Sequence, residues 1–183
     1  MGVIKMAAIK GFITNLGKYN EGELIGKWII FPIDEDELNE VLKEIGCTYY
    51  NEDGEKMNPF YEEYFFTDWD CDFDNDFGEF EDIDKINEYA ENLGFWDEDT
   101  LKAACEVWSF SEVIDNSPDD YNLYSDITND YDLGYYWIQE SGCYDLSNMG
   151  HLANYIDYEA FGRDIRFESN GGFTNYGWIE YVG

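Results

Sequence analysis

The stretch FITNLGKYNEGELIGKWIIFPID, residues 12–34, contains two apolar runs separated by a turn-forming segment. Residues 7–14 and 24–33 are rich in Ile, Phe and Trp, and they flank the polar sequence NLGKYNEGE. This pattern predicts two strands joined by a loop. Three glycines are expected to shape the loop and the start of the second strand, because glycine adopts backbone conformations that other residues avoid: Gly17, Gly22 and Gly26.

The next segment, DEDELNEVLKEIG at residues 34–46, predicts an amphipathic helix. Asp34 can cap its first turn, and Gly46 supplies a stop. The sequence EEYFFTDW, residues 62–69, predicts a returning strand. The apolar residues of the helix fall at i, i+3, i+4 and i+7: Leu38, Val41, Leu42 and Ile45.

The apolar spacing becomes helical from about Asp82. Ser111 begins a further short segment that stops near Pro118. After Tyr121, LGYYWIQESG is ambiguous between strand and helix, LANYIDYEAF predicts a helix, and IRFESNGGFTNYGWIEYV predicts a hairpin around Asn170-Gly171. Two sets of apolar residues mark the first two helices: Ile83, Ile86, Ala90 and Leu93, then Leu101, Ala104, Cys105 and Trp108.

These patterns predict an α+β fold class with three small domains. Residues 1–80 are expected to form an N-terminal α+β domain, a small sheet carrying one helix. Residues 81–120 are expected to form a middle domain of short helices. Residues 121–183 are expected to form a C-terminal α+β domain, a small sheet with helices.

The charge of the chain is extreme, because 42 acidic residues face ten basic ones and give a formal net charge of -32. Such an excess favours disorder, but a hydrophobic content of 44% with 19% aromatic residues provides material for ordered cores. We therefore expect a folded protein whose function requires the charge. Nucleic acid and anionic lipid would both be repelled, so the expected partner is basic.

The cysteines are far apart in sequence and lack the spacing of a metal site, which indicates free thiols in a reducing cytoplasm: Cys47, Cys71, Cys105 and Cys143. Lys5 and Lys10 interrupt the apolar N-terminal stretch, so it does not resemble a secretory signal. No run approaches the roughly 20 apolar residues of a membrane span. The sequence therefore predicts a soluble, cytoplasmic protein.

The stretch DWDCDFDNDFGEFED, residues 68–82, has acids at eight of its fifteen positions. Started at Asp70, it partly fits a calcium-binding EF-hand loop that ends at Glu81, but Asn75 stands where that loop requires glycine. Alternatively, these acids keep a charged surface soluble, or they imitate phosphates. Alternate acids of an extended strand would share one face at intervals of about 6 to 7 Å, and the net charge equals that of about 54 Å of duplex DNA, roughly 16 base pairs.

Catalytic signals are weak. His151 is the only histidine, no glycine-rich phosphate loop is present, and no carboxylate pair stands out among the acids. An enzyme is therefore the less favoured class, and no cofactor or metal is expected.

Four stretches together resemble the ArdA family of antirestriction proteins: FITNLGKYNEGELIGKWIIFPID at 12–34, EEYFFTDWD at 62–70, YYWIQESG at 135–142 and LANYIDYEAFGRDI at 152–165. The resemblance implies an elongated, curved protein of three small domains that dimerises through its C-terminal domain and mimics bent B-form DNA. Members are carried on mobile genetic elements, have no catalytic residues or cofactor, and bind the methyltransferase core of Type I restriction-modification enzymes. The family's short antirestriction stretch would lie at about residues 130–145.

This resemblance implies that incoming DNA is protected from cutting; it leaves open whether modification is blocked as well. A calcium-binding protein and a binder of another basic DNA-binding protein remain the alternatives. The acids expected to imitate phosphates are Asp68, Asp70, Asp72, Asp74, Asp76, Glu79, Glu81, Asp82, Glu106, Glu112, Asp115, Asp119, Asp120, Asp126, Asp130 and Asp132. The aromatic residues expected in the core or the dimer interface are Tyr135, Tyr136, Trp137, Tyr155, Tyr158 and Phe161. Arg163 and Arg166 are expected to neutralise local acids or to join that interface.

Overall fold

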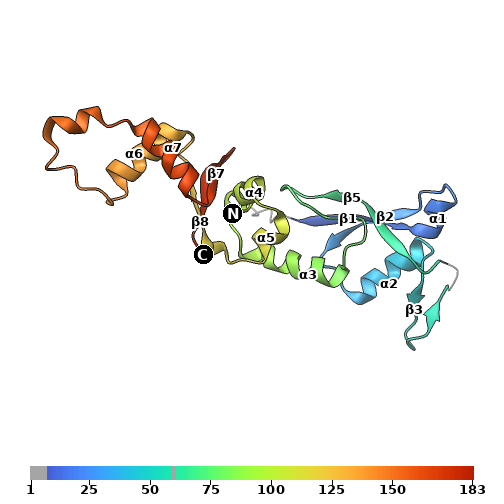
Figure 1. The fold of residues 1–183 in the computed structure, drawn as a ribbon. Helices are drawn as coiled ribbons and strands as arrows, with labels where there is room; N and C mark the ends of the chain where they lie inside the picture. Colours follow the sequence, from blue (N-terminus) through green and yellow to red (C-terminus); the bar gives the residue numbers. More distant parts are fainter. Residues whose placement is uncertain (1–7, 59–60) are drawn as a thin grey trace, which may run out of the picture. The chain divides into compact units, whose positions relative to one another are not determined.

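The computed structural model describes residues 8–58 and 61–183 (Figure 1). Helices and small separate sheets alternate along these residues, which confirms the predicted α+β class. Contacts between Cα atoms divide the chain into two compact units, Met1–Phe95 and Trp96–Gly183. These contacts group residues 81–95 with the N-terminal unit. The division into three domains, at residues 1–80, 81–120 and 121–183, remains a prediction. Residue 7 of the first predicted strand and the N-terminal sequence MGVIKMA lie outside the described residues.

The N-terminal unit is built on a three-stranded antiparallel sheet in the order β2-β1-β5. A short hairpin, β3-β4, follows the second helix. The elements in chain order are β1 (Ile9–Asn15), α1 (Leu16–Asn20), β2 (Gly26–Phe31), α2 (Glu35–Glu44), β3 (Tyr49–Tyr50), β4 (Lys56–Met57), β5 (Tyr64–Asp70), α3 (Ile83–Asn92) and the 3-10 turn η1 (Leu93–Phe95).

Alternation along the strands gives this sheet one buried face. Ile13, Ile29 and Phe66 are at most 3% exposed, and α2 and α3 lie along one side of the sheet (Figure 1). The predicted strand pair and the helix predicted at residues 34–46 are confirmed, although the segment predicted as a loop between the strands contains the short helix α1. The Asp34 side chain accepts a hydrogen bond from the backbone N–H of Glu37 at 2.8 Å. This cap fixes where α2 begins.

The C-terminal unit contains a second antiparallel sheet, in the order β6-β8-β7, together with helices. Its elements are α4 (Glu98–Val107), α5 (Phe110–Ile114), the 3-10 turn η2 (Pro118–Asp120), β6 (Tyr121–Tyr124), α6 (Asp130–Tyr135), the π-helical turn η3 (Tyr136–Glu140), the 3-10 turn η4 (Gly150–Tyr155), α7 (Tyr158–Glu168), β7 (Gly171–Thr174) and β8 (Gly177–Tyr181). The ambiguous segment LGYYWIQESG is thus mainly helical.

The predicted hairpin turn at Asn170-Gly171 is wrong. Asn170 follows the end of α7, and the hairpin reverses at Asn175 and Tyr176 instead. The Thr174 hydroxyl accepts a hydrogen bond from the Tyr176 N–H at 3.1 Å and donates to the Gly177 carbonyl at 2.9 Å. These local hydrogen bonds, and a φ of 125° at Gly177, close the turn without an Asn-Gly pair.

Helices α6 and α7 cross with their backbones in close contact. Gly134 in α6 and Gly162 in α7 are both buried at the crossing. A Cβ atom on Gly134 would overlap the carbonyl of Tyr158, and one on Gly162 would overlap the carbonyl of Asp130. Each helix therefore requires glycine where it meets the other.

The cysteines of the described residues are free thiols, as expected. Burial raises the pKa of Cys47 and of Cys71 to about 11, so both are protonated near neutral pH. In the described ranges, no helix combines the length and the apolar character that crossing a bilayer requires.

The helix crossing predicts a large cost for one methyl group. Gly162→Ala should lower the free energy of unfolding of the C-terminal unit by about 3 kcal/mol, because the backbones must separate. For a unit of this size the melting temperature should fall by roughly 12 to 24 °C. Thermal unfolding followed by circular dichroism measures this. Gly94→Ala is the matched control, since nothing lies within 4 Å of an added Cβ there; equal melting temperatures for the two variants would contradict the close crossing.

Candidate partner-binding surface

The acidic stretch 68–82 is held to the N-terminal unit by its aromatic residues. Phe73 is 7% exposed, and the Phe77 ring lies 4.8 Å from that of Trp69. The indole N–H of Trp69 donates a hydrogen bond to the Gly78 carbonyl at 3.0 Å. The aromatic side chains between the acids therefore give an irregular loop a fixed course.

The regular row of aspartates expected along a strand is only partly present. Strand β5 includes Asp68 and Asp70 and ends there, so Asp72, Asp74 and Asp76 lie in the irregular loop. The pairing of Lys10 with Asp70 is the last in the β1–β5 ladder, and the chain leaves the sheet after it. All five aspartates are exposed, but the spacing of a single extended strand does not apply to them.

The sixteen acids expected to imitate phosphates lie in both units, and most are exposed. Those of the N-terminal unit lie in β5, in the following loop and at the start of α3. Those of the C-terminal unit lie on α4 and α5, around η2, and before and within α6. The half-buried members are Glu81, Asp120, Asp130 and Asp132; the other twelve are exposed.

Several of these acids also hold backbone groups at helix N-termini. Asp82 accepts a hydrogen bond from the Asp84 N–H at 2.9 Å at the start of α3. Glu112 and Asp120 complete capping boxes at α5 and η2. Because a carboxylate near a helix N-terminus satisfies unpaired N–H groups, these acids stabilise the fold while their charge remains at the surface.

Other acids join segments that are distant in sequence. Glu106 on α4 accepts hydrogen bonds from the backbone N–H and the side-chain amide of Asn175, both at 2.9 Å, and so holds the β7–β8 turn. Asp130 accepts two hydrogen bonds from Arg166 across the α6–α7 crossing, at 2.8 and 3.3 Å. This ion pair raises the pKa of Arg166. The expectation that Arg166 neutralises a local acid is thus confirmed.

Many of the basic side chains lie against acids of the same unit. Lys10 is 2.6 Å from Asp70, whose hydrogen bond raises the pKa of the lysine. Further ion pairs are Lys27–Glu44, Lys43–Glu40, Lys56–Glu62 and Lys102–Glu98. The positive charge is therefore largely offset locally, and the remaining acids dominate the surface.

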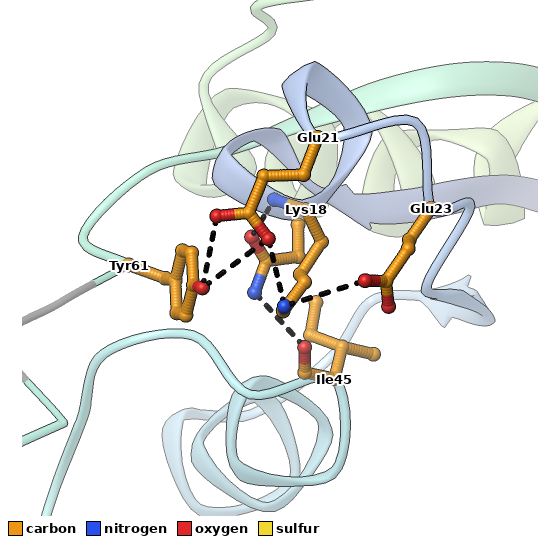
Figure 2. Close-up of polar contacts among 6 residues, drawn as sticks. Lys18, Glu21, Glu23, Ile45 and Tyr61 are labelled. Carbon is orange, nitrogen blue, oxygen red and sulfur yellow. Dashed lines mark hydrogen bonds and ion pairs between the residues drawn. The ribbon is translucent and has the colours of Figure 1, made fainter.

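Figure 2 shows such an arrangement around α1. The Lys18 ammonium lies 2.8 Å from Glu21 and 3.6 Å from Glu23, and the Tyr61 hydroxyl donates to Glu21 at 3.2 Å. The hydrogen bond to Glu21 is the main cause of the raised pKa of Lys18. One lysine thus fixes two carboxylates of the loop between β1 and β2.

The structure contains a second acidic area that the sequence patterns did not predict. α2 and the β3–β4 hairpin enclose a hollow of about 880 Å³ whose lining includes Glu35, Asp36, Glu40 and Glu52. The periodicity of α2 places three of these acids on one helix. However, only the folded hairpin brings Glu52 to them.

The calcium alternative requires the acids of 70–81 to converge on one point. Glu81 instead accepts a hydrogen bond from the Gly78 N–H at 2.6 Å, and strand β5 precedes the loop where an EF-hand has a helix. Within residues 8–58 and 61–183, no three or more His, Cys, Asp or Glu side chains group as metal ligands would. The arrangement gives the calcium alternative no support.

The aromatic residues expected at a dimer interface differ in exposure. Tyr155 is 83% exposed and Tyr135 is 41% exposed, whereas the other four are half-buried. Tyr158 packs against Tyr135 with ring centroids 5.4 Å apart, and Trp137 packs against the core of the unit. The stretch 130–145 comprises α6, η3 and the following turn, and it includes Asp145, whose pKa is lowered by hydrogen bonds from Ser147.

Exposed, oriented carboxylates in both units, with many of the bases already paired, define a protein suited to binding a basic macromolecule by charge. The model of the family described as Antirestriction protein (ArdA) matches residues 11–180, and the chain belongs to this family. Membership implies an antirestriction function and an interaction with restriction enzymes. No curated protein matches the chain.

Acids that hold distant segments of the fold together should respond to neutralisation differently from acids that are only exposed. Asp130→Asn should lower the melting temperature of the C-terminal unit by a few degrees, because Arg166 loses a charged partner at the helix crossing. Asp126→Asn is the matched control: Asp126 is exposed, and its removal reduces repulsion, so stability should stay equal or rise. Thermal unfolding followed by circular dichroism measures both melting temperatures. A larger decrease for Asp126→Asn than for Asp130→Asn would refute the structural role given to Asp130.

Proposed function

We propose that this chain blocks restriction by imitating B-form DNA and occupying the DNA-binding channel of Type I restriction-modification enzymes. Its exposed carboxylates stand in for phosphates and meet the lysines and arginines of the methyltransferase core. The mechanism requires no catalysis and no cofactor. The protein acts in the cytoplasm on behalf of incoming mobile DNA.

The observation that carries this proposal is the distribution of charge within the family fold. Acids are exposed in both units, and capping hydrogen bonds orient several of them. A preorganised acidic surface loses little conformational freedom on binding, so its charges act together. Duplex DNA likewise presents phosphates in fixed positions, and proteins bind them through many individually weak contacts.

The main test is binding of a purified Type I methyltransferase in competition with duplex DNA. Direct competition is expected, because both ligands need the same basic channel. If the methyltransferase binds the chain and DNA together, channel occupation is refuted. If no Type I enzyme binds and another basic DNA-binding protein does, the partner class is wrong.

Single neutralisations should have small effects, and combined ones a large effect. A fivefold variant changes exposed acids that have no capping role: Asp74→Asn, Glu79→Gln, Asp115→Asn, Asp119→Asn and Asp126→Asn. Each single change should weaken binding by less than about threefold, whereas the combined variant should weaken it more than tenfold and reduce its salt dependence, because fewer ion contacts form.

A matched control neutralises five exposed acids that lie outside the proposed set and do not line the hollow between α2 and the β3–β4 hairpin: Glu37, Asp53, Glu88, Glu91 and Asp99. It has the same net charge as the fivefold variant, so calorimetry over several salt concentrations separates position from total charge. Equal weakening by both variants would mean that only total charge matters. Loss of all binding through one substitution would indicate a discrete hot spot instead.

We also propose that the protein is a homodimer joined through its C-terminal unit. The exposed aromatic ring of Tyr155 supports this proposal, as do Leu152 and Phe167, which are 67% and 72% exposed. Two chains of charge -32 repel each other, so contacts made by such exposed apolar side chains must overcome the repulsion.

Added salt should tighten the dimer, because it screens the repulsion between chains while leaving apolar contacts intact. Tyr155→Asp should produce monomers at micromolar concentration. Tyr50→Asp, at a tyrosine 52% exposed in the N-terminal unit, adds the same charge and should leave the dimer intact. Light scattering measures both, and a wild-type monomer in moderate salt would refute the dimer.

A further inference from the structure

The sheet of the N-terminal unit has an open face that carries large apolar side chains. Along β1 and β2, Phe12 and Trp28 are paired and lie opposite the buried side, and Ile30 follows two residues later on that face. Trp28 is 44% exposed and Ile30 is 60% exposed. Apolar side chains gathered on an exposed sheet face are typical of a protein-binding surface.

Part of this face forms a shallow hollow of about 390 Å³. Its walls are rigid, because the rings of Phe12 and Trp28 pack edge to face with centroids 5.4 Å apart, and the ring of Tyr19 packs against that of Phe65 at 5.0 Å. Leu24, 67% exposed, stands at its edge. The residues lining the hollow are Phe12, Tyr19, Leu24, Trp28, Thr67 and Asp68.

The charge at this hollow is negative. Asp68 lies directly opposite Phe12 in the β1–β5 register and forms part of the wall. Lys10, on the same face of β1 as Phe12, is held by Asp70 at 2.6 Å. Lys27 contacts Glu44 of α2, on the helix-covered side of the sheet. An apolar hollow with an exposed carboxylate in its wall is complementary to a side chain that is both apolar and cationic.

We infer that this hollow holds an arginine side chain of the basic protein that the chain inhibits, an inference that rests on the proposed function. The guanidinium stacks on Trp28 and forms an ion pair with Asp68, while its methylene groups lie against Leu24. Arginine fits because it is planar, permanently charged and weakly hydrated, and it stacks on aromatic rings. Paired Trp and Arg residues are also characteristic of interface hot spots.

This contact differs in kind from phosphate imitation. DNA has no apolar face of this sort beside its phosphates, so the stacking of an arginine on Trp28 contributes binding energy that depends little on salt, unlike the ion pair with Asp68. The phosphate-like acids provide attraction that salt weakens. The hollow would therefore keep the inhibitor bound at salt concentrations where DNA is released.

A second copy of this chain fits the hollow poorly. Joining two such faces would bring the exposed Asp68 carboxylates of both copies toward the same apolar patch, where like charges repel at low dielectric. A basic partner relieves this charge instead.

The test uses the full chain and a purified Type I methyltransferase, with binding measured by calorimetry over a range of salt concentrations. The double substitution Leu24→Ser with Trp28→Ser should weaken binding about tenfold and leave the salt dependence unchanged. The single substitution Trp28→Phe, with Leu24 unchanged, should retain most of the affinity of the wild-type chain, because an aromatic face remains. Phe95→Ser, at an exposed aromatic residue of the same unit that lines neither hollow, is the control and should have no effect.

A double-mutant cycle tests whether one arginine spans both groups. Trp28→Ser and Asp68→Asn should be non-additive, because each removes part of the same contact. Additive effects, or unchanged affinity in the Leu24/Trp28 variant, overturn the inference while the proposed function stands. Altered dimerisation of that variant in light scattering assigns the hollow to a second copy and also overturns it. If the wild-type chain binds no methyltransferase, the proposed function fails, and this inference fails with it.

Discussion

Repulsion among 42 acids, opposed by ten bases, is the constraint on which the rest of the structure depends. A chain with this imbalance folds only if its apolar residues form cores and its acids remain in water or find donors. Both conditions are met within each unit. The sheet β2-β1-β5 and the sheet β6-β8-β7 each support buried aromatic and aliphatic side chains, and bases such as Lys10 and Arg166 lie against carboxylates.

The same constraint explains why so many helices begin at an acid. Asp34, Asp82, Asp97 and Asp157 each accept a hydrogen bond from a backbone N–H of the first turn. A helix N-terminus carries partial positive charge, so it favours a nearby carboxylate where the chain has few cations. These acids are consequently fixed in direction. A surface proposed to imitate DNA gains from this, because oriented charges need no further ordering when a partner binds.

Most of the local structure follows from the sequence. The two runs rich in Ile, Phe and Trp that flank a turn-forming segment predict the β1–β2 pair, and the spacing in 34–46 predicts α2 with its cap at Asp34. Both depend on interactions between near neighbours. The excess of acids and the resemblance in four stretches indicate the family, which the match over residues 11–180 shows. The locations of the exposed acids on loops and helix starts follow largely from the same patterns.

Tertiary structure decided what local patterns could not. β5 ends at Asp70, where its pairing with β1 ends, so the alternating aspartates beyond it do not have the strand geometry. The hairpin turns at Asn175 because Thr174 and Glu106 supply hydrogen bonds there, one of them from a distant helix. Gly134 and Gly162 are required only because α6 and α7 cross there with their backbones in contact. Asp68 and Trp28 lie on the same face of the sheet only because both pair with Phe12 of the central strand. Sequence alone determined the acids and the cores, because composition and short-range periodicity encode them, and the family, because four stretches resemble it. Which groups meet across the fold depends on pairings between distant segments, and only the tertiary structure decided these.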